Sequence, residues 1–232
     1  MSESHAIVSS QDWVAARKQL LAREKDFTRL RDELSEARRN LPWERVDKRY
    51  VFQTQEGPKT LAELFGDQRQ LVVYHFMFGP DWEQGCASCS FWADNFNGIT
   101  AHLAHRDVRM IAISRAPLPK LQAYARRLGW TFPWVSSSET DFNFDYGVSC
   151  RPGDRATYNY APFDGTFEER PGISVFYKDS SGAVLHTYSC YSRGIDLMNT
   201  AYNYLDLVPK GRDEAGLATP MSWLRRHDDY ER

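Results

Sequence analysis

Large apolar residues recur at every seventh position near the N-terminus, at Trp13, Leu20, Phe27 and Leu34. The stretch from residue 12 to residue 40 contains no Gly or Pro, and Ser9 three positions before Asp12 is typical of a helix N-cap. This spacing predicts a helix of about 28 residues with one apolar seam, which ends before Pro42. The seam can pack along the chain's own domain, or it can pair with a second copy and form a homodimer.

Further along the chain, two continuous apolar runs predict buried strands, and the segment between them has apolar residues at helical spacing. A strand, a helix and a second strand over this length form a parallel, right-handed unit. Alternating residues on both sides of a turn at 179–182 predict a β-hairpin. The expected elements are strands at 71–78 and 108–114, helices at 86–105, 119–128 and 195–205, and a hairpin at 173–178 and 183–189.

Residues 130–170 are rich in aromatic side chains and show no clear period, so they are interpreted as an insertion. The insertion either forms a secondary core or a hydrophobic lid that selects the substrate. The order βαβ–α–insertion–ββα is that of an α/β, thioredoxin-like fold. We therefore expect an N-terminal helical arm over residues 1–45, a thioredoxin-like domain over 46–208, and a loosely held polar tail over 209–232.

The motif Cys86-Ala-Ser-Cys89 lies between a buried strand and the predicted helix 86–105. A cysteine at a helix N-terminus meets unpaired backbone N–H groups and the positive end of the helix dipole, and both favour the thiolate. A second cysteine three residues later lies one turn away, where it can resolve a mixed disulfide. A CxxC motif within a βαβ pattern therefore indicates a redox site, with Cys86 as nucleophile and Cys89 as resolving cysteine.

A metal site is the competing interpretation of the same segment. Cys86, Cys89, His102 and His105 follow the pattern C-x2-C-x12-H-x2-H, which is close to a zinc-finger spacing. In a continuous helix, however, Cys89 and His102 are about 20 Å apart, too far to share one metal ion. Zinc remains an alternative only if the helix breaks at Asn97-Gly98, so we expect neither a metal nor a cofactor.

Composition and charge exclude other classes of protein. The chain has 29 Lys and Arg residues against 31 Asp and Glu residues, a formal net charge of −2, which argues against a dedicated nucleic-acid binder. No apolar run approaches the roughly 20 residues that span a bilayer, so no membrane association is expected. Because the chain begins without a signal-peptide pattern, we expect a cytoplasmic protein, where paired thiols tend to be catalytic or metal-binding.

The sequence resembles a bacterial family, the domain-of-unknown-function family 899, whose members are described as predicted dithiol-disulfide oxidoreductases with a thioredoxin-like fold. The resemblance rests on segments 71–82 and 85–98 around the CxxC motif, and extends from about residue 10 to residue 208. Further matching segments include Trp13, 38–43, 114–117, 129–136, 141–143 and 191–194. This resemblance implies a redox role for Cys86 and Cys89 and adds little about the substrate.

A proline usually precedes the first strand of the hairpin in thioredoxins, where it faces the CxxC motif in the cis form. Pro171 is roughly in that place, so a cis Arg170–Pro171 bond is one expectation and an ordinary trans bond the other. The usual Trp-Cys-Gly-Pro-Cys motif is missing, because Trp82 lies four residues before Cys86.

Six further residues are weaker candidates for supporting roles. His75 is either a hydrogen-bonded core residue or a proton relay, and Asp81 and Asp94 could accept the proton of the resolving thiol. Arg193 could assist a peroxidatic thiolate or form a surface ion pair. Cys150 and Cys190 are either inert buried thiols or a relay disulfide.

These features favour a thiol–disulfide oxidoreductase that acts on a protein or small-molecule disulfide or thiol. The related alternative is a thiol peroxidase of the peroxiredoxin-like type, in which Cys86 first becomes a sulfenic acid. The third hypothesis is a non-catalytic interaction protein, in which the long helix mediates assembly and the CxxC motif is vestigial.

Overall fold

The computed structural model describes residues 5–231 and divides into two compact units, Met1–Pro42 and Trp43–Arg232. The first unit is built on helix α1 (Ser10–Arg39), whose N-cap is Ser9, and the Ser9 hydroxyl accepts a hydrogen bond from the Asp12 N–H at 3.2 Å. The predicted helix and its cap are therefore confirmed. None of the helix residues is buried, and Trp13 and Phe27 of the seam keep 59% and 66% of their surface exposed.

Among residues 5–231, no helix combines the length and the apolar character needed to cross a bilayer.

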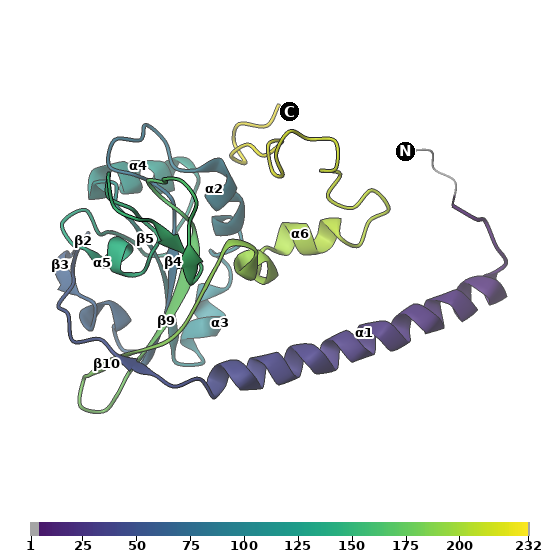
Figure 1. Cartoon of the computed structure of the whole chain (residues 1–232), viewed down its shortest axis with the longest axis horizontal. Helices are drawn as coiled ribbons and strands as arrows, with labels where there is room; N and C mark the ends of the chain where they lie inside the picture. The colour runs from purple at the N-terminus through teal and green to yellow at the C-terminus, as the bar shows by residue number, and fades with distance from the viewer. Residues whose placement is uncertain (1–4, 232) are drawn as a thin grey trace. The chain divides into compact units, whose positions relative to one another are not determined.

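The second unit contains the remaining elements, shown in Figure 1. Its strands are β1 (Glu44–Arg45), β2 (Val51–Thr54), β3 (Gly57–Thr60), β4 (Gln70–His75), β5 (Val108–Ser114), β6 (Trp134–Ser136), β7 (Thr157–Tyr158), β8 (Ala161–Pro162), β9 (Gly172–Lys178) and β10 (Val184–Tyr191). Its helices are η1 (Glu63–Phe65), α2 (Ala87–Ala93), α3 (Thr100–Ala104), α4 (Leu118–Arg127), α5 (Phe142–Asp145), η2 (Ser192–Met198) and α6 (Thr200–Leu205).

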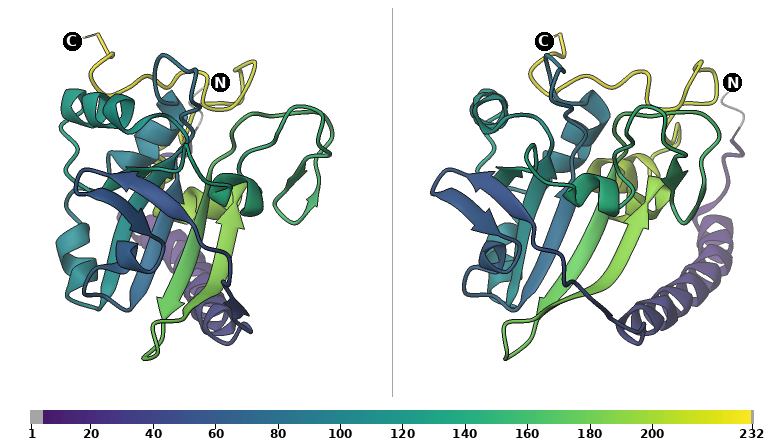
Figure 2. Two further views of the ribbon diagram at one scale, coloured as in Figure 1. Left: turned by 90° about the vertical axis from the view of Figure 1, so that its left-hand side faces the viewer. Right: turned by 60° about the vertical axis from the view of Figure 1, so that its left-hand side comes forward.

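Eight strands form the main sheet in the order β1-β10-β9-β4-β5-β6-β2-β3. Strands β4 and β5 are parallel, with α2 and α3 between them in the chain, and β9 pairs antiparallel with both β4 and β10. This arrangement is the thioredoxin fold that the element order predicts. The separate β7–β8 hairpin stands away from the main sheet in the left view of Figure 2.

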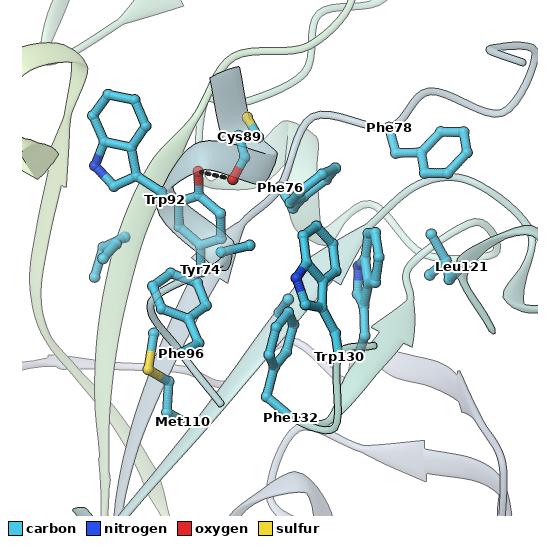
Figure 3. Packing of buried hydrophobic residues seen from close by; sticks show 14 of the residues in the cluster. Tyr74, Phe76, Phe78, Cys89, Trp92, Phe96, Met110, Leu121, Trp130 and Phe132 are labelled. Carbon is cyan, nitrogen blue, oxygen red and sulfur yellow. Dashed lines mark hydrogen bonds between the residues drawn. The ribbon is translucent and has the colours of Figure 1, made fainter. Parts of the chain in front are cut away.

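The sheet separates two hydrophobic cores, because successive side chains of a strand point to opposite faces. Tyr74 and Phe76 belong to the core that also contains Cys89 of α2 and Leu121 of α4. Val73, the neighbour of Tyr74, belongs to the opposite core, together with residues of η1 and α5. Figure 3 shows the first core, in which an aromatic cluster lies beside the α2 turn that carries Cys89.

The predicted single helix over residues 86–105 is wrong, because the chain leaves the helix between α2 and α3. Asn97, in the weak stretch Asn97-Gly98, uses its side chain elsewhere: it donates to the Gly129 carbonyl at 2.9 Å and accepts from the Thr131 N–H at 2.8 Å. These bonds fasten the segment after α4 and compensate for the interrupted helix.

The aromatic segment 130–170 is not one insertion in the structure. Its first part forms β6, which pairs parallel with β5 inside the main sheet, and Trp134 packs on Phe76 with ring centroids 4.6 Å apart. Only the part between β6 and β9, which contains α5 and the β7–β8 hairpin, departs from the regular alternation of strands and helices. Three residues are too few for β6 to show a period in the sequence.

The C-terminal tail is packed, in contrast to the loose tail that its polar composition suggests. Leu224 is only 4% exposed, and the ring of Trp223 contacts that of Phe91 at 5.8 Å. The carboxylate of Glu214 accepts hydrogen bonds from Trp223 Nε1 at 2.7 Å and from the Tyr202 hydroxyl at 2.8 Å. A few apolar anchors and directed hydrogen bonds therefore hold a segment that is polar on average.

Candidate active site

Cys86 lies at the N-cap of α2, where the loop that follows β4 turns into the helix. Its backbone N–H donates to the Met77 carbonyl at 3.1 Å, and its carbonyl accepts from the Ser90 hydroxyl at 2.9 Å. The backbone of Cys86 is thus fixed on both sides, and its side chain remains half-buried.

The surroundings of Cys86 favour its thiolate. A hydrogen bond from the Cys89 thiol is the largest cause that lowers the Cys86 pKa to about 6, and the N–H groups of Cys89 and Ser88 act in the same direction. The Cys89 N–H points to Cys86 Sγ at 3.5 Å. These N–H groups belong to the first turn of α2, as expected for a cysteine at the N-terminus of a helix.

Cys89 has the opposite character. It is 2% exposed, and burial together with the neighbouring Cys86 raises its pKa well above the usual range. The hydroxyl of Tyr74 approaches from below and donates to the Cys89 carbonyl at 3.4 Å, as the dashed line in Figure 3 marks. The same hydroxyl lowers the Cys89 pKa and so partly offsets the cost of a buried thiolate.

A cavity of about 280 Å³ lies against the two cysteines. Side chains from β4, α2, the segment before β9, η2 and the C-terminal tail surround it. Its apolar walls include Trp92, Ile195 and Met221, and its charged lining residues are Arg170, Arg193 and Asp196. Cys86 and two arginines therefore belong to the lining of one cavity.

The tail also fixes the loop that carries Cys86. Arg226 donates from Nη2 to the Gly85 carbonyl at 2.7 Å and from Nε to the Tyr124 hydroxyl at 2.7 Å. Tyr124, from α4, donates in turn to the Gly85 carbonyl at 3.2 Å. The residue directly before the nucleophile is therefore held by contacts from two distant parts of the chain.

The family model described as "Bacterial protein of unknown function (DUF899)" matches residues 2–230. The chain belongs to this family. No curated protein matches it significantly.

Two solved structures illustrate the folds to which the chain is similar. Peroxidoxin BcpB from Mycobacterium tuberculosis has a TM-score of 0.46 and 17% identity, over 67% of this chain and 92% of that protein. A mutant PrxQ of Xylella fastidiosa has a TM-score of 0.45 and 14% identity, over 70% of this chain and 95% of its own.

Of the supporting residues predicted from the sequence, Pro171 and Arg193 line the cavity with the two cysteines. All peptide bonds between described residues are trans, so of the two forms expected for the Arg170–Pro171 bond the structure has the ordinary trans one. Two hydrogen bonds hold the chain beside this bond. The Arg170 N–H donates to the Val148 carbonyl at 2.7 Å, and the Tyr158 hydroxyl donates to the Pro171 carbonyl at 2.7 Å. Trp82 lies outside the lining and donates to the Glu168 carboxylate at 2.6 Å.

The other predicted proton-transfer residues lie away from the cysteines. His75 is on the opposite face of the sheet, where its Nε2 shares a hydrogen bond with the Ser174 hydroxyl at 2.8 Å and burial lowers its pKa to about 3. Of its two expected roles, His75 therefore has that of a hydrogen-bonded core residue. Asp81 is exposed, and Asp94 accepts a hydrogen bond from Trp130 Nε1 at 2.8 Å and pairs with His227 at 2.8 Å. Neither aspartate lines the cavity, because the loop and the helix turn carry them outward.

Cys150, Cys190 and the two histidines of the zinc hypothesis lie outside this cavity. All four cysteines are thiols, and neither Cys150 nor Cys190 lines the cavity. His102 and His105 are exposed at α3, and no group of three or more His, Cys, Asp or Glu side chains within residues 5–231 is arranged to hold a metal ion. The break after α2 therefore does not bring the four zinc candidates together.

The cavity also contains residues that the sequence does not mark as candidates, among them Tyr74, Tyr158 and Arg170. In the sequence, Tyr74 is one residue of a buried strand and Tyr158 one of the many aromatic residues of segment 130–170. Arg170 directly precedes Pro171, which was already a candidate, and this adjacency was the one available signal.

Brief treatment with iodoacetamide at neutral pH is expected to label Cys86 before Cys89. Because the Cys86 pKa is lowered to about 6, its labelling rate should rise with pH through about 6 and level off above 7. Peptide mapping measures the label, with half-buried Cys150 as an internal comparison. A label found mainly on Cys89 would reverse the assignment of the two roles.

Proposed function

We propose that this protein is a thiol–disulfide oxidoreductase with Cys86 as nucleophile and Cys89 as resolving cysteine. The observation that carries the proposal is the asymmetry of the pair beside one cavity. Cys86 is half-buried with a lowered pKa, whereas Cys89 is buried with a raised pKa. Disulfide exchange requires this division, since the attacking sulfur must be an accessible thiolate.

In the first step, the Cys86 thiolate attacks one sulfur of a substrate disulfide. A bond forms between Cys86 Sγ and that sulfur, the substrate S–S bond breaks, and the other substrate sulfur leaves as a thiolate. In the second step, Cys89 loses its proton to solvent and its thiolate attacks Cys86 Sγ. The bond between Cys86 and the substrate breaks, the second substrate sulfur leaves as a thiolate, and a Cys86–Cys89 disulfide remains. Two electrons have then passed from the dithiol to the substrate, and the reverse sequence oxidises a dithiol.

The first step also prepares Cys89 for the second. The negative charge on Cys86 is one cause of the raised Cys89 pKa, and it disappears when Cys86 enters the mixed disulfide. Cys89 therefore becomes easier to deprotonate once there is an intermediate to resolve.

This function fits a reducing compartment such as the cytoplasm, where a dithiol is regenerated by cellular thiols. A protein or small-molecule disulfide is the proposed substrate class. The thiol peroxidase alternative uses the same Cys86 thiolate, and differs in that peroxide oxygen, rather than a substrate sulfur, is attacked.

A redox titration tests the proposal. In buffers of defined potential, the full chain is expected to show one reversible two-electron transition between about −270 and −120 mV, the range of known exchange proteins. Mass spectrometry after alkylation should assign the transition to a disulfide between Cys86 and Cys89. A chain that forms no such disulfide in this window would support the non-catalytic interaction protein instead.

A further inference from the structure

Arg170 is a cation without a carboxylate partner inside the cavity of the dithiol. Its guanidinium lies over the rings of Phe163 and Phe167, at 4.7 and 5.5 Å from their centroids. Its Nε is buried and has no hydrogen-bond partner. None of the ion pairs formed between residues 5–231 includes Arg170, although it lines the same cavity as Cys86 and Cys89.

The other charged residues of the lining compensate one another. Arg193 is 84% exposed at its side chain and pairs with Asp196 at 3.2 Å, and Asp196 also pairs with Arg212 at 3.2 Å. The charge of Arg193 is therefore screened by solvent and by a partner. Arg170 is the uncompensated positive charge of this cavity.

The backbone next to Arg170 is held firmly before any ligand arrives. The preceding residue, Glu169, has a buried carboxylate that pairs with Arg115 at 2.9 Å and accepts a hydrogen bond from the Ser149 hydroxyl at 2.8 Å. Together with the aromatic rings under the guanidinium, these contacts restrict the side chain. A group that binds Arg170 therefore loses little free energy in ordering it.

We infer that Arg170 binds a carboxylate of a small, anionic thiol or disulfide substrate, whose sulfur then lies at Cys86. Guanidinium groups bind carboxylates through paired, charge-assisted hydrogen bonds, and the neighbouring apolar walls suit the carbon skeleton of the same molecule. The cavity of about 280 Å³ matches a low-molecular-weight compound rather than a folded protein. This inference rests on the proposed function and names the substrate class for it.

Two thiols of equal length test the inference on the oxidised full chain. One is 3-mercaptopropionate, which carries a carboxylate, and the other is the neutral 3-mercapto-1-propanol. Each rate of reduction of the Cys86–Cys89 disulfide is divided by the thiolate concentration and by the rate of the same thiolate with a small neutral disulfide, which corrects for both the thiolate fraction and the intrinsic nucleophilicity. The wild-type chain is expected to prefer the anionic thiol by at least about tenfold, which is the effect of a single charge-assisted hydrogen bond.

Three variants separate a binding role from a structural one. R170Q should abolish the preference while leaving the rate with the neutral thiol nearly unchanged, and R170K should keep part of it. R193Q removes the same charge from the same cavity at an exposed, ion-paired position, and should keep the preference within about twofold.

The outcomes distinguish the inference from the function on which it rests. If the ratio of the anionic-thiol rate to the neutral-thiol rate is the same in the wild type and in R170Q, the role of Arg170 is overturned while disulfide exchange stands. If neither thiol reduces the disulfide, the proposed function itself fails.

Discussion

The C86S variant is expected to lose disulfide exchange by a factor on the order of 10³ or more, because a serine hydroxyl is not ionised at neutral pH and cannot replace the thiolate. The C89S variant should behave differently. Its Cys86 still attacks the substrate, but nothing resolves the intermediate, so a mixed disulfide accumulates. Rates are measured with a chromogenic disulfide under excess substrate, and the trapped adduct is identified by mass.

Cys150 offers the matched control, since it is a half-buried thiol outside the cavity. C150S should keep the activity within about twofold, and a larger loss in C150S than in C86S would contradict the assignment of the nucleophile. The C89S variant also separates the two redox chemistries. Rapid capture of a disulfide substrate supports exchange, whereas faster reaction with hydrogen peroxide and a sulfenic acid on Cys86 supports the thiol peroxidase alternative.

Those parts of the fold that depend on local pattern could be predicted from the sequence. The Ser9 cap of α1 and the contact between Cys86 and Cys89 each join residues only three positions apart. The seven-residue spacing of the α1 seam is likewise a local pattern. The β4–α2–β5 unit followed by the β9–β10 hairpin could be read from runs of apolar residues. These elements were enough to predict the thioredoxin fold and the two cysteines.

The rest of the site depends on contacts between distant residues, which no local period reveals. Arg226 binds the Gly85 carbonyl across 141 positions of the chain, within a tail whose composition suggests no structure. Asn97 lies between α2 and α3, and its side chain bonds to Gly129 and Thr131, more than 30 positions away. For Arg170, the sequence shows neither that it lines the cavity of the two cysteines nor that its buried Nε has no hydrogen-bond partner.

The charged residues of helix α1 differ between the two sides of its apolar seam. With the seam residues Trp13, Leu20, Phe27 and Leu34 as a positions of a heptad, Leu30 occupies a d position and Arg23 interrupts the d positions. The g positions are Asp12, Gln19, Asp26 and Glu33, and the e positions are Arg17, Glu24, Arg31 and Arg38. The two flanks of the seam therefore differ in sign.

We propose that α1 pairs with α1 of a second copy as a parallel coiled coil. In a parallel pair, each g residue faces the e residue five positions later on the other helix. This places Asp12 opposite Arg17, Asp26 opposite Arg31 and Glu33 opposite Arg38, all with opposite charges. In an antiparallel pair, g faces g and e faces e, so that mostly like charges would meet. Large seam side chains that are about half exposed or more would then be covered by the partner.

Reversing two g positions, with D26R and E33R in one chain, is expected to convert the dimer into a monomer, because both residues then face arginines of the partner. Sedimentation of the full chain at tens of micromolar measures the change.

The matched control combines D32R with E36R, which alters the charge equally at positions that point away from the seam. This control should remain dimeric. Adding R31E and R38E to the variant D26R/E33R restores the opposite charges and should restore the dimer. In the wild-type background, R23L should strengthen the dimer by completing the seam.

A photoreactive residue in place of Ala16 should cross-link to the N-terminal half of the partner helix, since only a parallel pair brings equal positions together. A monomeric wild-type chain at this concentration, or cross-links to the C-terminal half of the helix, would overturn the parallel dimer.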